Sequence, residues 1–183
     1  MTRLTIYGDF NCPFSALASV RADVLLAAGG HEVEWRAVQH DPAIPVAGEP
    51  VGGDTFAEFL AEVAKVRELS VDDVRLELTV PPIRSNTAAA SAAFAAAGDD
   101  ADQARRRLFA AVWAEGRNVG DPAQLVRIGA TGRDDVVAGR WQAEFEALPK
   151  PITPSLVLPD GYVSRGLGAL ARLADLVAAV PST

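Results

Sequence analysis

The first 38 residues contain the pattern that most restricts the fold: a strand, a helix and a second strand in close succession. Residues 4–9 alternate like a strand and are rich in β-forming types. From Pro13 onward, apolar residues recur at three- and four-residue spacing, and a Gly-Gly pair at 29–30 ends this helix. Residues 31–38 alternate again. Such a sequence predicts a βαβ unit, with parallel strands and a right-handed crossover.

Beyond this unit the pattern is mostly helical until a hairpin near the end. A loop rich in proline and glycine covers residues 39–54. Helical spacing then predicts a series of helices, at about 54–68, 70–78, 86–97, 102–115, from 122 onward, and 134–147. A turn at 159–161 joins short strands at 155–158 and 162–164, and a last helix covers 167–180. The predicted order is β-α-β, several helices, then β-β-α.

Two of the predicted helices begin with recognisable capping signals. Asp121 precedes Pro122, and an acidic cap followed by proline at the first helical position is typical of a helix start. Either Ser85 or Asn86 is expected to cap the Ala-rich helix, because both side chains accept hydrogen bonds from the first free N–H groups.

Charge and hydropathy exclude two classes of partner and indicate a compartment. The formal net charge is -7, and an acidic chain repels phosphate backbones, so we expect no nucleic-acid partner. No apolar stretch approaches the roughly 18 residues of a membrane helix, so we expect no membrane partner. The first residues run directly into a strand pattern and show no signal-peptide pattern. We therefore expect a cytoplasmic protein.

The chain contains one cysteine, Cys12. A single cysteine cannot form an intramolecular disulfide, and it cannot build a thiolate zinc site alone. No other cluster of metal-ligating residues stands out, so we expect no metal. An isolated cysteine is most often a small buried apolar side chain. Only its neighbours in the chain can indicate a chemical role.

Those neighbours place Cys12 between the first strand and the first helix. Pro13 takes the first helical position, so the sulfur lies beside unpaired backbone N–H groups and the positive end of the helix dipole. This position favours a thiolate, and it predicts a pKa lowered from about 8.5 toward roughly 3.5–7.5. The hydroxyl of Ser15, one turn on, is able to point back at the sulfur. The segment Cys12-Pro13-Phe14-Ser15 is therefore the candidate reactive site.

Three polar residues elsewhere are weaker candidates. His40 follows the second strand and, if the strands are parallel, lies at the same sheet edge as Cys12, where it is able to act as an acid or base. We favour the alternative of an exposed loop histidine. Arg84 lies near the expected cleft entrance and is able to meet the carboxylate of a peptide thiol, although a surface role is favoured. For Asn86, a helix-capping role accounts for its position.

These features together resemble the DsbA family of thioredoxin-fold proteins. The resemblance rests on the Cys-Pro-Phe-Ser turn, the long helical insertion, Thr153-Pro154 before the hairpin, the Asn86-Thr87 helix opening and the segment 108–121. It implies an α/β thioredoxin-like fold with an inserted all-helical domain. The thioredoxin-like domain would comprise residues 1–50 and 130–183, and the insertion residues 51–129.

The same resemblance implies roles for individual residues. Cys12 would be the nucleophile, Pro154 would follow a cis peptide bond and lie with Thr153 against the sulfur, and Pro13 and Phe14 would support the site. Dithiol members of the family have cysteine at the position of Ser15. Without that cysteine a mixed disulfide on Cys12 cannot be resolved internally, so turnover would require an external thiol.

Three functions remain open at this point. We favour a thiol–disulfide oxidoreductase whose partner is a small-molecule thiol or a protein thiol or disulfide. A thiol-dependent isomerase or transferase is the second, because the chain is similar to hydroxychromene-carboxylate isomerases and kappa-class glutathione transferases. These relatives carry serine in place of Cys12 and bind a thiol cofactor in the same cleft. Their Asn-Thr helix start also faces that cleft, so the resemblance implies that Asn86 is a candidate thiol-binding residue here, as an equal alternative to helix capping. The third is a non-enzymatic binding protein.

If the protein is an oxidoreductase, an isomerase or a transferase, we expect no tightly bound cofactor. A low-molecular-weight thiol, glutathione or an equivalent, would serve as co-substrate. Either a monomer or a homodimer is compatible with the sequence.

Overall fold

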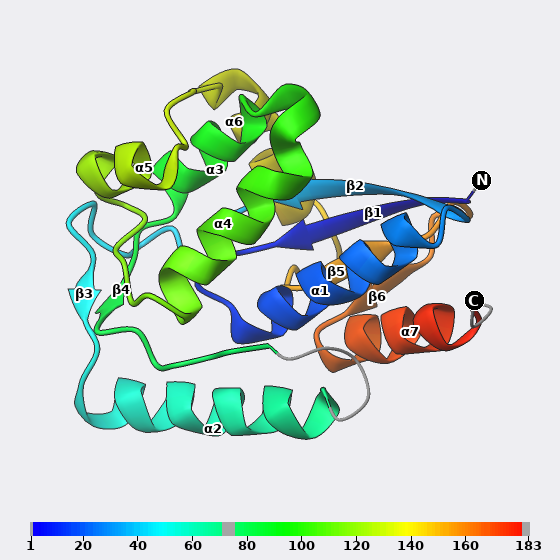
Figure 1. Cartoon of the computed structure of the whole chain (residues 1–183), viewed down its shortest axis with the longest axis horizontal. Helices are drawn as coiled ribbons and strands as arrows, with labels where there is room; N and C mark the ends of the chain where they lie inside the picture. Colours follow the sequence, from blue (N-terminus) through cyan, green and yellow to red (C-terminus); the bar gives the residue numbers. More distant parts are fainter. Residues whose placement is uncertain (1, 71–75, 181–183) are drawn as a thin grey trace.

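A four-stranded mixed sheet forms the centre of the protein in a computed structural model that describes residues 2–70 and 76–180 (Figure 1). The strand order is β2-β1-β5-β6, with bounds Thr2–Gly8 for β1, His31–Ala37 for β2, Ser155–Val157 for β5 and Val163–Arg165 for β6. β1 pairs with β2 in parallel, while β1–β5 and β5–β6 are antiparallel. The predicted βαβ unit and hairpin are thus both present, and β5 joins them through β1.

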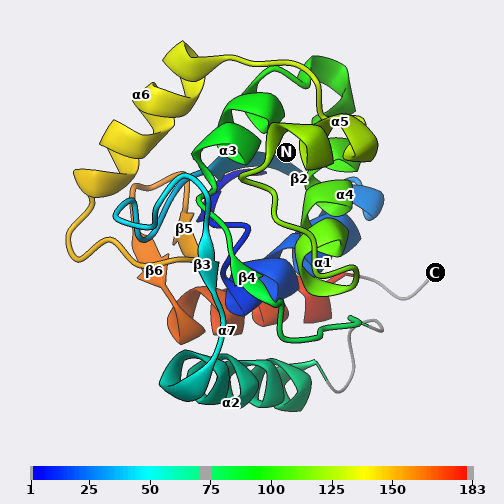
Figure 2. The ribbon, with the colours of Figure 1, turned by 90° about the vertical axis from the view of Figure 1, so that its left-hand side faces the viewer.

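Helices cover both faces of this sheet. The bounds of the longer helices are Pro13–Ala27 for α1, Gly53–Leu69 for α2, Ala88–Ala95 for α3, Ala101–Trp113 for α4, Asp135–Glu146 for α6 and Leu167–Ala178 for α7. α1 and α7 pack together on one face, and α6 lies on the other (Figure 2). α5, Pro122–Ile128, and a 3₁₀ turn at Gly98–Asp100 complete the helical part.

The side-chain alternation of β1 explains this layering. Leu4 and Ile6 are fully buried in the main core, which also contains Leu17 and Leu25 of α1. Tyr7 points to the opposite face and packs against Phe145 of α6, with ring centroids 6.0 Å apart. Successive strand residues face opposite sides, so one short strand anchors a helix on each face. The predicted α/β thioredoxin-like fold is confirmed.

α2 lies at the edge of the molecule and covers the start of α1 (Figures 1 and 2). Its buried residues are Phe59, Val63 and Val66, at the three- and four-residue spacing of one helix face. The Phe59 ring meets the Trp113 ring of α4 edge-on, with centroids 5.7 Å apart. The helices of the insertion therefore share one apolar core with the sheet. The domain boundaries at residues 50 and 130 stay a prediction.

Three local expectations need correction or restriction. The segment 39–54, predicted as a loop, includes strand β3, Glu49–Pro50, which pairs with β4, Ile83–Arg84. Two-residue strands have too few positions to show alternation, which explains why the sequence did not indicate them. The helix predicted at 70–78 falls largely outside the described residues, and residues 76–78 are not helical.

The cap of the Ala-rich helix also differs from the prediction. α3 begins at Ala88, so Thr87 occupies the N-cap position, but the Asn86 side chain accepts a hydrogen bond from the first helical N–H, that of Ala88, at 3.2 Å. The Ser85 hydroxyl instead accepts a hydrogen bond from the Val119 N–H at 3.1 Å. The Asp121 prediction is confirmed, because its carboxylate accepts from the Ala123 N–H at 2.8 Å.

Candidate active site

Cys12 occupies the N-cap position of α1, with extended backbone angles of φ -94° and ψ 116°. Its carbonyl accepts the first helical hydrogen bond, from the Ala16 N–H at 3.1 Å. Pro13 follows as the first helical residue, where its missing N–H leaves no bond unmade. The thiol is half-buried and lies at the end of α1 from which free N–H groups point outward.

The Thr153 segment lies against the sulfur. The Cys12 thiol donates a hydrogen bond to the Thr153 carbonyl oxygen, with Sγ and O 3.6 Å apart. The Thr153–Pro154 peptide bond is cis. β1 and β5 pair with Tyr7 opposite Ser155, and this register carries the residues preceding β5 to the turn that follows β1. Residues 141 positions apart in the chain therefore meet at the thiol.

Ser15 is fully buried beneath Cys12. Its hydroxyl and its backbone N–H both hydrogen-bond the Cys12 sulfur. The same hydroxyl accepts a hydrogen bond from the Asp9 N–H at 3.3 Å. Ser15 is therefore in the expected place, pointing back at the sulfur from the first turn of α1.

The pKa of the Cys12 thiol is nevertheless raised. Burial is the largest cause, and the nearby negative charge of Asp9 adds to it, while the hydrogen bonds of Ser15 and Thr153 lower the pKa. The prediction of a lowered pKa is therefore wrong. A helix N-terminus can be read from sequence, but the burial of the sulfur in the folded chain cannot.

Asp9 is a buried carboxylate at this site, and the sequence analysis did not identify it. One of its oxygens accepts from the Asn11 N–H at 3.0 Å and from the Thr87 hydroxyl at 2.9 Å. The other accepts from the His40 N–H at 2.8 Å. Burial raises the pKa of Asp9, and these three hydrogen bonds lower it in part. Its place at the end of the first predicted strand, three residues before Cys12, was the available signal.

Asn11 joins the active-site turn to the inserted helices. Its side-chain amide donates to the Ser85 carbonyl, and its side-chain oxygen accepts from the Ser85 N–H at 3.2 Å. Asn86 beside it donates to the Ile44 carbonyl at 2.6 Å and accepts from the Gln39 side chain at 3.1 Å. The Asn86 side chain thus holds the loop after β2, and it is not among the described residues that line the cavity beside Cys12.

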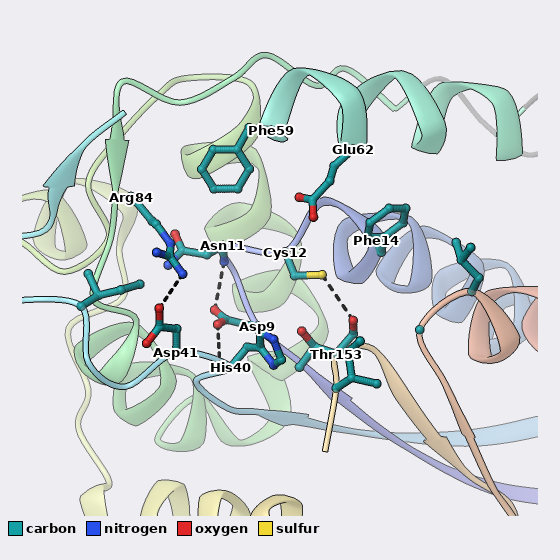
Figure 3. Close-up of a pocket in the computed structure, with 14 residues that line it drawn as sticks. Asp9, Asn11, Cys12, Phe14, His40, Asp41, Phe59, Glu62, Arg84 and Thr153 are labelled. Atoms are coloured by element: carbon teal, nitrogen blue, oxygen red, sulfur yellow. Dashed lines mark hydrogen bonds and ion pairs between the residues drawn. The ribbon is translucent and has the colours of Figure 1, made fainter. Parts of the chain in front are cut away.

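A cavity of about 340 Å³ opens beside the Cys12 sulfur (Figure 3). Its apolar walls come from α1, α2, the start of α7 and the segments near β3 and β5, and consist of Phe14, Ile44, Phe59, Ile152 and Leu167. Its polar walls consist of Asp9, Asn11, His40, Asp41, Glu62, Arg84 and Thr153. Of the site residues predicted from sequence, five therefore line one cavity: Cys12, Phe14, His40, Arg84 and Thr153.

The two weaker candidates at this cavity differ in their surroundings. The His40 residue is exposed, and its backbone N–H rather than its ring contacts Asp9. Arg84 forms ion pairs with Asp41 at 2.7 Å and with Glu49 at 3.7 Å.

Glu62, which no sequence pattern indicated, enters the cavity from α2. Its distance of 50 positions from Cys12 explains why no local pattern indicated it.

Two features of the described chain limit the other classes of site. Within residues 2–70 and 76–180, no group of three or more histidine, cysteine, aspartate or glutamate side chains is arranged to hold a metal ion. Over the same residues, no helix is long and apolar enough to cross a membrane. The site chemistry that the described residues offer is that of the thiol and its neighbours.

Comparison with known structures agrees with this fold over the whole chain. A probable DsbA oxidoreductase from Streptomyces coelicolor is 18% identical, with a TM-score of 0.67, covering 100% of this chain and 93% of that one. The cytosolic disulfide reductase DsbM from Pseudomonas aeruginosa, solved with GSH, is 16% identical, with a TM-score of 0.65 and 96% coverage of both chains. A 2-hydroxychromene-2-carboxylate isomerase is 20% identical, with a TM-score of 0.56, covering 98% and 100%.

The comparison with family models identifies the chain at the level of sequence. Curated protein sequences give no match. Residues 3–132 match the model of the DSBA-like thioredoxin domain. This match includes the Cys12 turn and all of the predicted helical insertion, and it confirms the resemblance on which the fold prediction relied. The chain belongs to the family of DSBA-like thioredoxin domain proteins.

Proposed function

We propose that the protein is a cytoplasmic thiol–disulfide oxidoreductase with Cys12 as its single nucleophile. The observation that supports this most strongly is the position of the sulfur. Cys12 lies at the start of α1, faces a cavity of about 340 Å³ and is bounded by Ser15 and Thr153. A structural cysteine has no need of such an opening, whereas a nucleophile must reach its substrate.

The proposed reaction has two exchange steps. The Cys12 thiolate attacks one sulfur of a disulfide R–S–S–R′, the S–S bond breaks, and R′S⁻ leaves and takes a proton from water. The product is a mixed disulfide, Cys12–S–S–R. An external thiolate R″S⁻ then attacks the sulfur of R, which releases R–S–S–R″ and restores the Cys12 thiolate. The described residues 2–70 and 76–180 contain no second cysteine, so the second step is intermolecular.

Neighbouring groups have separate parts in this scheme. The hydroxyl and N–H of Ser15 stabilise the thiolate by hydrogen bonds to the sulfur. In the resting state the Thr153 carbonyl accepts a hydrogen bond from the Cys12 thiol and so orients the sulfur. Phe14 lines the cavity beside the sulfur, and Pro154 follows Thr153 through a cis peptide bond. Because burial raises the pKa of Cys12, the reactive thiolate is the minor form at neutral pH and the rate is expected to increase with pH.

The external thiol is proposed to be a small molecule, glutathione or an equivalent. The DsbM structure solved with GSH, which has the same fold, is consistent with a thiol co-substrate. The cavity provides room for such a molecule beside Cys12, with His40 and Arg84 on its polar side. No tightly bound cofactor is required by the two exchange steps.

A thiol-dependent isomerase is the second candidate, and the apolar part of the cavity supports it. Phe14 and Phe59 lie on either side of the opening to Cys12, where a planar organic substrate would find apolar contacts (Figure 3). In that case Cys12 would contribute to binding or to covalent addition, and no disulfide would be consumed. Measuring disulfide reduction and isomerisation of an unsaturated substrate in parallel separates the two.

The test is to trap the mixed disulfide. The protein is incubated with a small disulfide, and the adduct is located by intact-mass and peptide mass spectrometry. We expect one adduct, on Cys12, that is removed by added thiol. Cys12→Ser should form no adduct, while circular dichroism confirms that it folds. Failure of the unchanged protein to form an adduct, although unfolded protein reacts, would overturn the proposal.

A further inference from the structure

Glu62 faces the reactive cysteine from the opposite wall of the cavity (Figure 3). It lies three residues after Phe59 and one before Val63, and it is half-buried on the side of α2 that turns inward. Burial raises the pKa of Glu62, as does the nearby charge of Glu58, while the charge of Arg84 lowers it in part. Among the residues that the structure describes, none forms a hydrogen bond or an ion pair with this carboxylate.

The other charges at the cavity are already matched. Asp41 is paired with Arg84, and Arg84 also meets Glu49. The buried carboxylate of Asp9 accepts three hydrogen bonds from the protein. Three carboxylates and one guanidinium thus line the cavity, and Glu62 is the carboxylate to which none of the described residues gives a hydrogen bond or an ion pair, because the nearby Arg84 is paired with Asp41 and Glu49. The field near the sulfur is therefore expected to be negative.

We propose that Glu62 selects, among the disulfides and thiols that exchange with Cys12, those that carry a positive charge close to their sulfur. This inference rests on the exchange reaction proposed above. An ammonium group that enters with the ligand would be attracted to the Glu62 carboxylate, while a carboxylate would meet a like charge. The rings of Phe59 and Phe14 on either side reduce the screening by water and strengthen both effects.

The exchange reaction is the same for every disulfide. The effect of the charge on the disulfide can therefore be tested separately from the reaction. In each case the Cys12 thiolate attacks R–S–S–R, forms Cys12–S–S–R and releases RS⁻. Three small symmetric disulfides differ mainly in R: cystamine carries ammonium groups, 2-hydroxyethyl disulfide is neutral, and dithiodiglycolate carries carboxylates. The intrinsic reactivity of each is measured with the same protein unfolded in concentrated urea.

The experiment follows adduct formation by intact-mass spectrometry at one mildly alkaline pH and low ionic strength. Each rate with folded protein is divided by the rate with unfolded protein. We expect the order cystamine, 2-hydroxyethyl disulfide, dithiodiglycolate, with a cationic-to-anionic ratio on the order of tenfold. High salt should reduce this ratio, because it screens charges that are open to solvent.

Variants of α2 assign the effect to one side chain. Glu62→Gln should reduce the ratio several-fold, and Glu62→Lys should reverse the order. Glu68→Gln removes an exposed carboxylate from the same helix, where it pairs with Lys65 at 2.9 Å, and should leave the ratio unchanged. Glu62 has no hydrogen bond to lose, and circular dichroism checks that each variant folds.

The possible results separate this inference from the exchange reaction itself. If all three disulfides react equally after normalisation, charge selection is wrong while the exchange at Cys12 stands. If the order appears but Glu62→Gln retains it, the assignment to Glu62 is wrong. If no disulfide forms an adduct with the folded protein, the proposed function itself fails.

Discussion

Cys12 and Asp9 lie close together because residues 9–12 form the short turn between β1 and α1. Asp9 is buried and Cys12 is half-buried, and in both cases burial raises the pKa. Two acids that desolvate each other favour their protonated forms. The resting site is therefore expected to hold Cys12 as a thiol. The negative charge of Asp9 opposes ionisation of that thiol.

Asp9→Asn is expected to lower the pKa of Cys12, because the substitution removes a negative charge next to the thiolate. The rate of alkylation by iodoacetamide should then rise at lower pH than in the unchanged protein. Asp175→Asn, which removes an exposed carboxylate on α7, is the control and should not move the profile. Coinciding profiles for Asp9→Asn and the unchanged protein would contradict this role.

Asp9 also predicts a pH dependence of stability. Its pKa is higher in the folded chain than in the unfolded chain, so the folded state binds the proton more tightly. Its contribution to the free energy of unfolding is fully present below the ordinary carboxyl pKa and is lost as the pH rises through the raised value. Urea unfolding across this range should show a shallower decline for Asp9→Asn. An unchanged slope would show that Asp9 titrates normally.

The Trp35 side chain of β2 packs directly against the backbone of β1, and this packing depends on one glycine, Gly8. A Cβ atom at Gly8 would lie 2.2 Å from the Trp35 ring, which covers this end of the sheet. Trp35 pairs with Ile6 in the sheet, and Gly8, two residues after Ile6, lies diagonally opposite Trp35. A glycine inside a strand pattern commonly marks such an approach.

Gly8→Ala is therefore expected to destabilise the protein by about 1–3 kcal/mol, because the ring of Trp35 must move within a packed core. The free energy of unfolding in urea measures the effect. Gly139→Ala on α6 is the control, since its added Cβ has no neighbour within 4 Å, and helix propensity favours alanine there. A Gly8→Ala variant as stable as the unchanged protein would show that the ring is free to shift.

A buried ion pair connects α4 to α1. Arg105 of α4 is fully buried, pairs with Asp23 of α1 and lies over the Trp35 ring, 5.4 Å from its centroid. Removing one partner of a buried pair leaves an uncompensated charge, which costs about 3–5 kcal/mol. Because Asp102 still meets Arg105 at 3.0 Å, we expect the lower end of that range for Asp23→Ala.

Urea unfolding of Asp23→Ala checks this value. Glu68→Ala breaks the exposed pair with Lys65 and should cost less than about 1 kcal/mol. Equal losses for the two variants would mean that the Arg105 pair contributes no more than a surface pair. A larger loss for Asp23→Ala would show that this pair anchors the inserted helices to the thioredoxin-like part.

Over the whole molecule, local patterns predicted the two parts of the sheet well. The alternation in residues 4–9 and 31–38 and the turn at 159–161 are local signals, and each corresponds to an observed strand or hairpin. The proximity of Cys12 to Thr153 followed from the family resemblance, because β5 pairing with β1 is a long-range contact.

The remainder of the site depends on packing that no local pattern shows. Asp9 reaches the cavity from the turn after β1 and Glu62 reaches it from α2, and no local sequence pattern indicates that these segments meet. The direction of the Cys12 pKa shift was missed for the same reason, since burial depends on what covers the sulfur. Helix starts and strand periods are local properties, whereas desolvation and facing charges are not.

Turnover at Cys12 is expected to require an external thiol, and the stoichiometry of disulfide cleavage measures this requirement. Reduced protein is mixed with a chromogenic disulfide in the absence of other thiols, and the released thiol is followed with time. We expect a burst of one released thiol per Cys12, followed by no turnover until a small-molecule thiol is added. Continued turnover without added thiol, or no burst at all, would contradict this expectation.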